Sequence, residues 1–493
     1  MDGAIRRADE LRSAAITVAV ADLDAARYDF HRQHPSRSAK RTFYVTQVLA
    51  FAALAGALIW SSINYAGVTF YALHVAALTL FASAIALRFA AAAHVSRLLT
   101  PLAAPQHWPI YTILCPLYRE ANVVADLVSA LERLDYPGHA LNVMLLVEGD
   151  DVDTMAAALA CSAPAHIDVV IVPAAAPRTK PKALNVGLAL ARGEYVVVFD
   201  AEDRPHPQQL LASLAAFERG GKSLACVQAP LEIDNAEASW IARQFAAEYA
   251  IQFREILPLL ARLKLPLPLG GTSNHFRTDV LKAAGGWDAF NVTEDADLGY
   301  RLAREGYRSD VIGPPTYEEA PVTFAAWLKQ RTRWIKGHMQ TWLVLMRDPV
   351  RTAREMGLAG FAAMQLMLGG GLAAAFAHGP LACIVLIAAL SPYDLLSRAD
   401  FALALFGYCV AVFSALTAAG VSGNLNHLRA ALTMPFYWPL ASVAAILALF
   451  ELLFRPHHWA KTAHGVSPRA RPAIPHQRSE PSSAHICATS ASL

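Results

Sequence analysis

The sequence lacks the spacing patterns of several common kinds of site. Its six cysteines are scattered without a C-x-x-C pair, so neither a zinc site nor a disulfide framework is indicated. No G-x-G-x-x-G follows the first expected strand and no G-x-x-x-x-G-K-S/T occurs, which excludes a dinucleotide fingerprint and a P-loop. The formal net charge is only +2, which gives no reason to expect a nucleic acid as a partner.

Long apolar stretches are abundant in a chain of 493 residues that is 55% hydrophobic and has a mean hydropathy of +0.32. Each of two stretches near the N-terminus, 44–60 and 68–93, is close to the ~20 residues that cross a bilayer core, and the second contains one internal charge, Arg88. The C-terminal third repeats the pattern at residues 356–377, 381–390, 401–421 and 431–454. We therefore expect six membrane spans, with five as the alternative because 381–390 is short.

Basic residues predict how these spans are oriented. Some forty residues, many of them polar or charged, precede the first apolar stretch, so we expect that stretch to remain as an anchor and not to be cleaved as a signal peptide. Basic residues flank the spans on the side that should face the cytoplasm: Arg37, Lys40, Arg41, Arg97, Arg347, Arg351 and Arg354. Six spans would return Arg455 and Lys461 to that side, whereas five would place them outside. These features predict a multi-pass protein of a bacterial-type inner membrane.

The segment boundaries follow from this pattern. We expect a cytoplasmic N-terminal segment at 1–42, two transmembrane helices within 43–97, and one globular domain over 105–349. About four transmembrane helices should follow at 355–454. The tail, 455–493, should be cytoplasmic and partly disordered, since its last twenty or so residues are rich in Ser, Pro and Ala.

Short apolar runs alternate with helical patterns in the middle segment. The runs are 110–115, 143–147, 169–172 and 195–199, and the helical patterns are 123–134, 182–191 and 207–217. This alternation predicts an α/β domain with a parallel sheet covered on both faces. Ligands of such sheets bind beyond the carboxyl ends of the strands, so the residues that follow each run are candidates for the site.

Acidic residues recur at three of these strand ends. They are Glu120 after the first run, Glu148, Asp150, Asp151 and Asp153 after the second, and Asp200, Glu202 and Asp203 after the fourth. Gathered carboxylates repel one another unless a cation lies among them, and their hard oxygens suit Mg²⁺ or Mn²⁺ together with phosphate oxygens. The alternative for any one of them is a helix cap or a solvated loop residue.

Three further groups carry candidate chemistry. Lys182 and Asn185 begin a helix where a cation and an amide could meet an anion. Glu294 and Asp295 lie at another predicted helix N-terminus, where the helix dipole favours an ionised carboxylate that accepts a proton, although N-capping explains them equally well. A third helix carries Gln330, Arg333 and Trp334 on one face, where they could hold phosphate oxygens and stack on a sugar ring. Because tryptophans recur along this helix at about two turns, it could also lie at the membrane surface.

Together these residues resemble membrane-bound, cellulose-synthase-like family 2 glycosyltransferases. The motifs P-x-Y-x-E (116–120), D-x-D (200–202), T-E-D (293–295) and Q-x-x-R-W (330–334) occur in family order over about 220 residues. In the second motif Glu202 replaces the second aspartate, and Glu148 and Asp150 replace the usual pair of aspartates after the second strand.

The resemblance implies a GT-A fold and an inverting transfer from a nucleotide-diphosphate sugar, most simply a UDP-sugar. Tyr118, Glu120 and Glu148 or Asp150 would hold the nucleoside, and Lys182, Asn185 and Asp200 would belong to the donor site. Asp200 and Glu202 would coordinate Mg²⁺ or Mn²⁺, and Asp295, beside Glu294, would be the general base. Gln330, Arg333 and Trp334 would close the donor site and present the acceptor; the glycine-rich 270–274 could line the acceptor pocket.

Three functions remain open from the sequence. The first is extension of a polysaccharide coupled to its export, because the Q-x-x-R-W motif is typical of such enzymes. The second is transfer of a single sugar to a lipid or a lipid-linked glycan. The third is a membrane transporter or scaffold in which the acidic clusters are structural.

Overall fold

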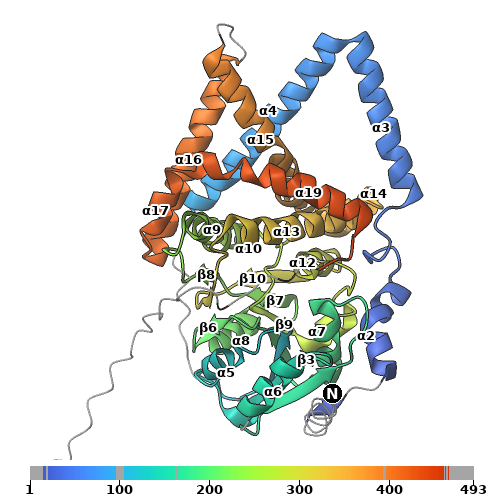
Figure 1. Ribbon diagram of the computed structural model, residues 1–493, viewed down its shortest axis with the longest axis vertical. Helices are drawn as coiled ribbons and strands as arrows, with labels where there is room; N and C mark the ends of the chain where they lie inside the picture. The colour runs from blue at the N-terminus through green and yellow to red at the C-terminus, as the bar shows by residue number, and fades with distance from the viewer. Residues whose placement is uncertain are drawn as a thin grey trace, which may run out of the picture.

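The computed structural model describes residues 15–17, 20–95, 105–162, 164–391, 396–459, 461 and 465. Arg97 and the predicted disordered end of the tail lie outside the described residues. An α/β domain forms one half of the molecule, and long helices project from one side of it (Figure 1). The predicted class, an α/β domain with a helical transmembrane region, is confirmed.

The central sheet has eight strands in the order β1-β4-β3-β2-β5-β9-β7-β10. They are β1 (Ile16–Thr17), β2 (Tyr111–Leu117), β3 (Leu141–Glu148), β4 (Ile167–Val172), β5 (Tyr195–Val198), β7 (Leu224–Gln228), β9 (Asn274–Arg277) and β10 (Arg308–Val311). The four predicted strands are present as β2 to β5, pair in parallel, and are almost wholly buried, as their Val, Ile and Leu content requires. The sheet as a whole is mixed, because β9 runs antiparallel to both β5 and β7.

The expected all-parallel sheet is therefore wrong at one strand. The chain leaves the sheet after β7, forms helices, and returns as β9 from the opposite direction. A second, three-stranded sheet of β6 (Arg204–Pro205), β11 (Thr316–Glu318) and β8 (Leu231–Ile233) lies beside the strand ends.

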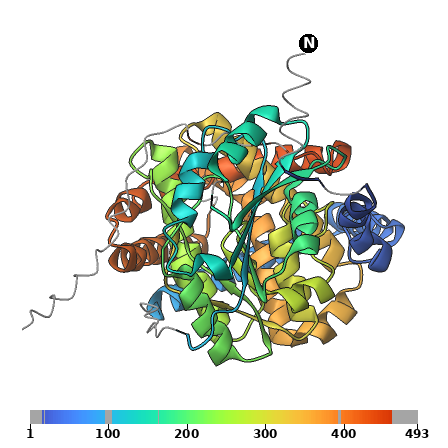
Figure 2. The same cartoon turned by 90° about the horizontal axis from the view of Figure 1, so that it is seen from below.

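Helices cover both faces of the central sheet (Figures 1 and 2). Those of the domain and the segment before it are α2 (Val20–Gln33), α5 (Val124–Leu131), η1 (Gly138–Ala140), α6 (Val152–Cys161), α7 (Lys180–Leu190), α8 (Gln209–Gly220), α9 (Trp240–Ile251), η2 (Gln252–Ile256), α10 (Leu257–Arg262), α11 (Thr278–Ala283), α12 (Glu294–Arg304) and α13 (Phe324–Leu345). Two hydrophobic cores, one on each face, hold the sheet between these helices. The three predicted helices are present as α5, α7 and α8.

Five helical segments among the described residues are long and apolar enough to cross a membrane. They are Val45–Asn64 (α3), Ala66–Ala93 (α4), Pro349–Leu390, Arg398–Ser422 (α16) and Met434–Phe454. The third comprises α14 (Pro349–Met364), η3 (Gln365–Gly369) and α15 (Gly370–Leu390), and the fifth comprises α18 (Met434–Tyr437) and α19 (Leu440–Phe454). The backbone of α14 is kinked at Gly357, whose φ is 74°, and from this kink onward the stretches 356–377 and 381–390, expected as two spans, lie in one helical segment.

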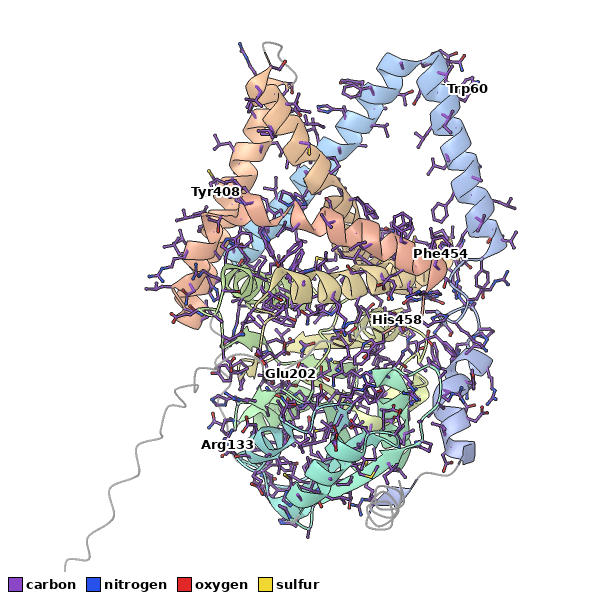
Figure 3. All side chains as sticks on the ribbon, viewed as in Figure 1. Trp60, Arg133, Glu202, Tyr408, Phe454 and His458 are labelled. Carbon is purple, nitrogen blue, oxygen red and sulfur yellow. The ribbon has the colours of Figure 1, made fainter. Side chains whose placement is uncertain are left out.

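Two helical hairpins project from the domain on the same side. One is α3 with α4, whose far end carries Trp60, and the other is α15 with α16, which carries Tyr408 (Figures 1 and 3). By contrast, α13 and α19 pack together and run across the face of the domain beneath the hairpins (Figure 1). A short helix, α17 (Asn426–Ala431), joins α16 to this layer.

The end of the chain returns to the domain. Buried Lys336 on α13 contacts Glu451 at 2.7 Å and donates to the backbone carbonyl of His458 at 2.6 Å. Phe454 and His458 accordingly lie over the face of the domain (Figure 3). The beginning of the tail is therefore on the same side of the hairpins as the domain, whichever number of helices crosses the bilayer.

Candidate active site

A single cavity of about 560 Å³ collects most of the predicted site residues. It lies where the carboxyl ends of the strands meet α12 and α13, and it extends up to the membrane helices. The predicted residues that line it are Tyr118, Glu120, Glu148, Asp200, Glu202, Glu294, Asp295, Gln330, Arg333 and Trp334. Asp200 and Asp295 thus share one cavity, although 95 positions separate them in the sequence. Asp150, Lys182 and Asn185 do not line it.

Lys180 is the cation at the centre of the acidic residues. Its Nζ lies 2.5 Å from Asp200 Oδ1 and donates to the carbonyl of Gly271 at 2.6 Å. Burial lowers the pKa of Lys180. The negative charges of Asp200 and Glu294 outweigh this effect and raise the pKa above its usual value. Sequence reasoning chose Lys182 on the same helix and missed Lys180, although both follow the threonine that precedes α7.

Glu294 and Asp295 form the first turn of α12 and face this lysine. Burial raises the pKa of Glu294 to about 8 and that of Asp295 to about 6, while the charge of Lys180 opposes both shifts. Asp295 Oδ1 accepts a hydrogen bond from the Ala296 N–H at 2.8 Å, which favours its ionised form. Thr293 precedes the helix but makes no side-chain capping bond, so capping by Thr293 does not explain this motif. Of the two acids, Asp295 has the lower pKa and therefore ionises first as the pH rises.

The acids that follow β5 divide into cavity-lining and supporting residues. Asp200 and Glu202 line the cavity. Asp203 is 1% exposed and accepts hydrogen bonds from the Asp200 N–H at 2.7 Å and from the Thr272 hydroxyl, so it fixes the turn. Asp203 Oδ1 is buried without a hydrogen-bond partner among the described residues. The described part of the chain contains no group of three metal-ligating side chains, so a cation beside Asp200 and Glu202 would need oxygens from a ligand to complete its shell.

Tyr118 and Glu120 follow β2 at the other end of the cavity. Glu120 Oε1 lies 2.8 Å from the ammonium of Lys461, and this ammonium also lies 5.8 Å from the centre of the Tyr118 ring. Arg178 lies over the same edge, 2.7 Å from Asp150 and 3.4 Å from the Tyr118 hydroxyl. A flat aromatic ring with cations and carboxylates at its rim can hold a base and its ribose. Lys461 is a site residue that the sequence could not place, because 341 positions separate it from Glu120.

Lys182 and Asn185 support the site from behind it. Lys182 is fully buried and pairs with Glu148 at 2.7 Å. Burial raises the pKa of Glu148 and lowers that of Lys182, and the ion pair opposes both shifts. The Asn185 side chain bonds the N–H and the carbonyl of Trp287 at 2.9 and 2.8 Å. Both residues hold the loop and strand ends together and do not face the cavity.

The Q-x-x-R-W face of α13 closes the cavity on its membrane side. The Gln330 side chain is 8% exposed, and its Oε1 has no hydrogen-bond partner among the described residues, so it is available to a ligand hydroxyl. Arg333 feels the charges of Glu294 and Asp200, and its guanidinium lies 5.1 Å from the ring centre of Trp459. Trp334 packs against aromatic rings of α9.

Gly337 explains how α13 approaches the T-E-D turn so closely. A Cβ at this position would lie 2.4 Å from Thr293 Cγ2 and 2.6 Å from Thr293 Oγ1, so only glycine fits. This close contact holds the T-E-D motif next to the helix that carries the Q-x-x-R-W motif.

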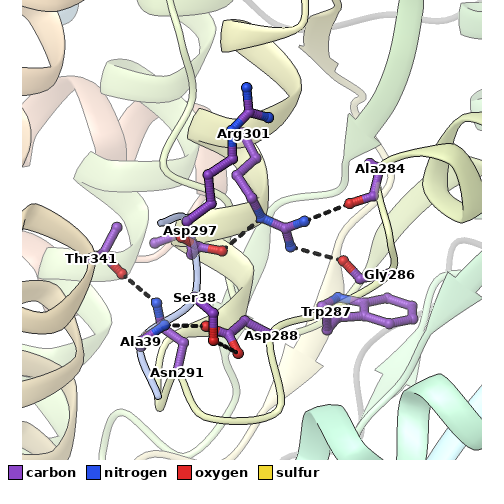
Figure 4. A network of polar contacts seen from close by, with 12 residues as sticks. Ser38, Ala39, Ala284, Gly286, Trp287, Asp288, Asn291, Asp297, Arg301 and Thr341 are labelled. Carbon is purple, nitrogen blue, oxygen red and sulfur yellow. Dashed lines mark hydrogen bonds and ion pairs between the residues drawn. The ribbon is translucent and has the colours of Figure 1, made fainter. Parts of the chain in front are cut away.

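A polar network outside the cavity holds α12 from its other side (Figure 4). Arg301, 2% exposed, pairs with Asp297 at 2.8 Å and donates to the carbonyls of Ala284 and Gly286. Asp288 accepts from Ser38 Oγ at 3.1 Å and the Ala39 N–H at 2.5 Å. The segment before the first membrane helix is therefore tied to the loop that leads into α12.

Residues 108–337, a little under half of the chain, match the family model described as "Glycosyltransferase like family 2". In its mixed sheet and its strand-end acids, this part of the chain is similar to family 2 glycosyltransferase domains. Five candidate membrane helices lie before and after this part of the sequence, which makes the chain a multi-pass membrane protein.

Curated relatives are similar over this domain. The chain is 27% identical over 265 residues to a beta-monoglucosyldiacylglycerol synthase from Nostoc sp. (51% of this chain, 55% of the relative). It is 26% identical over 263 residues to a probable glucomannan 4-beta-mannosyltransferase from Oryza sativa subsp. japonica (51% and 44%). The chain spans about half the length of these curated relatives.

Solved structures that are similar to this chain include a mannosyltransferase from Pyrobaculum calidifontis in complex with GDP-Man and Mn²⁺. Its TM-score is 0.45 and its identity 19%, over 78% of this chain and 98% of that chain. The first 349 residues of Staphylococcus aureus TarS give a TM-score of 0.37 at 12% identity, over 73% and 98% of the two chains.

Proposed function

We propose that this protein transfers a sugar from a nucleotide-diphosphate sugar to a hydroxyl of a membrane lipid, with inversion at the anomeric carbon. The observation that carries the proposal is the continuity of the cavity. Its one end has carboxylates and cations at the ends of sheet strands, and its other end is lined by Met367, Leu372 and Ala375 of the membrane segment. A nucleotide sugar entering from water and a lipid entering from the bilayer would meet beside Asp295.

The donor end supports binding of a nucleoside diphosphate. Tyr118, Glu120 and Lys461 surround the place for the nucleoside, and Lys180 and Arg333 supply positive charge for the diphosphate. A UDP-sugar is the simplest donor, and a GDP-sugar is the alternative. Asn185 and Lys182 act through the loops that they hold, and Asp150 acts through its ion pair with Arg178.

Asp200 and Glu202 fit a divalent cation. Mg²⁺ and Mn²⁺ bind through one or two carboxylates and complete their shells with substrate phosphate oxygens, which agrees with the two cavity-lining acids on this turn. Such a cation would neutralise charge on the departing nucleoside diphosphate. Lys180, already beside Asp200, supplies positive charge to the same oxygens.

In the proposed reaction, one residue accepts the proton that the acceptor hydroxyl loses. The acceptor oxygen attacks the anomeric carbon while the bond from that carbon to the diphosphate oxygen breaks, and the electron pair leaves with the nucleoside diphosphate. Asp295 takes the proton of the acceptor hydroxyl as general base. Glu294, with the higher pKa, remains protonated at neutral pH and keeps the pair from carrying two negative charges.

Extension of a polysaccharide is the second candidate. The Q-x-x-R-W face and the similarity to a glucomannan mannosyltransferase favour it. The lipid acceptor is preferred because the inner end of the cavity is mainly apolar, and because relatives named as glucolipid synthases are similar over the same domain.

The proposed orientation places the domain in the cytoplasm of a bacterial-type cell. Arg37, Lys40, Arg41 and Arg347 lie on the domain side of the hairpins, in keeping with the positive-inside rule. Labelling of single cysteines at Trp60 and at Arg133 in intact cells and in inverted vesicles tests this arrangement, since the two sites should react from opposite sides.

The central experiment uses the purified full-length protein in proteoliposomes with Mn²⁺ and a panel of radiolabelled nucleotide sugars. We expect label from one donor to enter the organic phase as a glycolipid carrying one sugar. Aqueous polymer that grows with time would support the polysaccharide instead. Equal transfer by Asp295→Asn would contradict an enzymatic role for this site and favour a transporter or scaffold.

A further inference from the structure

Arg88 is an ionisable residue within a membrane helix that the proposed reaction does not use. It lies on α4, near its domain end, is half-buried, and lines the same cavity as Asp295. Charged residues inside membrane segments are costly and usually face a functional site. An arginine at a helix end often extends along the lipid face to reach the headgroups, but Arg88 lines the interior cavity.

The guanidinium of Arg88 has no protein acceptor among the described residues. It forms no hydrogen bond and no ion pair within 4 Å there, although it carries five N–H donors. The nearest opposite charges, Glu248 and Glu255, act on it only at longer range. Leaving such donors unsatisfied beside a bilayer is unfavourable, so an acceptor from a ligand would stabilise the arrangement.

Both glutamates are already engaged by other partners. Glu248 accepts from Arg331 and from the Tyr437 hydroxyl. Glu255 accepts from Ser414 and from Thr417 Oγ1, the latter at 2.6 Å. They lower the cost of placing a cation here, yet leave its donors free for an anion.

Two π-helical segments pack against the helix that carries Arg88. Both η2 and η3 pack against α4, and both contribute side chains to the cavity, among them Gln252 and Met367. π-helical turns interrupt the regular α-helical bonding and occur frequently at functional sites. His378, which also lines the cavity and feels the charge of Arg88, lies 5.7 Å from Trp438 between ring centres.

We infer that Arg88 binds the phosphate of an anionic lipid acceptor, one whose headgroup carries a phosphodiester next to a free hydroxyl. This inference rests on the proposed function and narrows its substrate class. A guanidinium holds phosphate oxygens through two parallel hydrogen bonds. The lipid chains contact Met367, Leu372 and Ala375, and the hydroxyl reaches Asp295. The acceptor oxygen then bonds to the anomeric carbon, its proton passes to Asp295, and the nucleoside diphosphate leaves with the electron pair.

Lipid binding without any nucleotide sugar tests the inference separately from catalysis. The full-length Asp295→Asn protein, in detergent, is mixed with equal amounts of phosphatidylglycerol and diacylglycerol, and bound lipid is counted by native mass spectrometry. Both probes carry a free glycerol hydroxyl, but only the first carries a phosphate. We expect phosphatidylglycerol to be preferred by about tenfold or more, the scale of a charge-assisted hydrogen bond.

Two substitutions at Arg88 and one control complete the experiment. Arg88→Gln should abolish the preference for phosphatidylglycerol, and Arg88→Lys, which keeps the charge without the planar fork, should reduce it severalfold. Arg354→Gln is the matched control, because Arg354 is an exposed arginine on α14 that does not line the cavity. Its preference should equal that of the parent protein. Size-exclusion profiles verify that each variant is folded.

Three results would overturn the inference: equal binding of the two lipids, an unchanged preference in both Arg88 variants, or displacement of the lipid by millimolar inorganic phosphate or a soluble acidic oligosaccharide. The last result would assign the site to a free anion or a polymer. Failure of the proposed function is distinguishable, because a folded protein with Asp295 intact that shows no sugar transfer can still have an Arg88-dependent lipid preference.

Discussion

Two lysines that are two positions apart illustrate how the surroundings of a side chain set its role. Lys180 lies in the cavity beside Asp200, and Lys182 is enclosed in a pair with Glu148. We expect Lys180→Met to lower kcat/KM by about two orders of magnitude with little change in the melting temperature. Lys182→Met should destabilise the fold by about 3 kcal/mol, because it leaves a buried carboxylate unpaired. Donor kinetics and thermal unfolding of both variants measure these effects, and the reverse pattern would show that Lys182 is the ligand-binding residue.

If Asp295 is the general base, as proposed, its carboxylate gives the proposed transfer a pH dependence. Its pKa is raised to about 6, and the base must be ionised, so the fraction of active enzyme rises with pH through this value. We expect kcat/KM to fall about tenfold for each pH unit below 6, and Asp295→Asn to lower it by about 10³-fold. A pH profile from 4.5 to 8 in proteoliposomes, with donor hydrolysis in parallel, checks this. A profile that is flat down to pH 5 would assign the base elsewhere.

At the residue scale the sequence predicted which motifs form the site but not every residue that faces it. Ten of the predicted side chains line the cavity, since strand ends and the first turns of helices are fixed by the fold. Lys182 and Asn185 were chosen because they match a motif spacing. Two residues along a helix turn the side chain to a different face, and only the packing of α7 on the sheet shows that Lys180 is the one that faces the ligand.

At the scale of elements, the close contact between α12 and α13 depends on Gly337, which has no side chain. Gly337→Ala should push α13 away from Thr293 and lower kcat by about tenfold or more, since small displacements of catalytic groups are costly. Gly420→Ala on α16 is the matched control, because a Cβ there meets nothing within 4 Å. The transfer rates of the two variants are compared at equal expression. An equal loss of rate in both variants would contradict a specific role for the close packing at Gly337.

The Arg301–Asp297 pair provides an independent test of how α12 is held. Arg301→Met leaves a buried carboxylate and two carbonyls without donors, so we expect a loss of about 3–5 kcal/mol in the free energy of unfolding. Replacing Arg32, which forms an exposed ion pair with Asp24, should leave the free energy of unfolding almost unchanged. Chemical unfolding followed by tryptophan fluorescence measures both.

Element types were predictable where the pattern was long and apolar, as in β2 to β5 and the membrane helices. The antiparallel β9 was not, because Asn-His-Phe-Arg has no apolar alternation and its direction is set by the preceding helices. The helix that joins 356–377 to 381–390 was also missed; it contains Pro380 and continues to Leu390.

At the scale of the whole molecule, a divalent cation and the tail should each contribute to use of the nucleotide sugar. Removing divalent ions with a chelator should abolish transfer, and Mn²⁺ or Mg²⁺ should restore it, because the protein supplies too few ligands to retain the ion alone. Retained activity in excess chelator would instead assign charge neutralisation to Lys180.

Truncation separates the part of the tail that reaches the site from the rest. Ending the chain after residue 458 removes Trp459 and Lys461 but keeps His457 and His458, and we expect the KM for the nucleotide sugar to rise about tenfold. Ending it after residue 465 should leave the KM unchanged, and an equal rise in both would contradict a role for Lys461.

Both ends of the chain meet around the loop that precedes α12. Ser38 and Ala39 hold Asp288 from one side, and on the other the His457 ring nitrogens lie 3.0 and 3.2 Å from the carbonyl oxygens of Phe290 and Lys40. During synthesis the ribosome delivers His457 only after the final apolar helix has been made. A nascent chain therefore lacks this contact to the loop before α12 until its last apolar helix has been made, so the proposed site is completed late in synthesis.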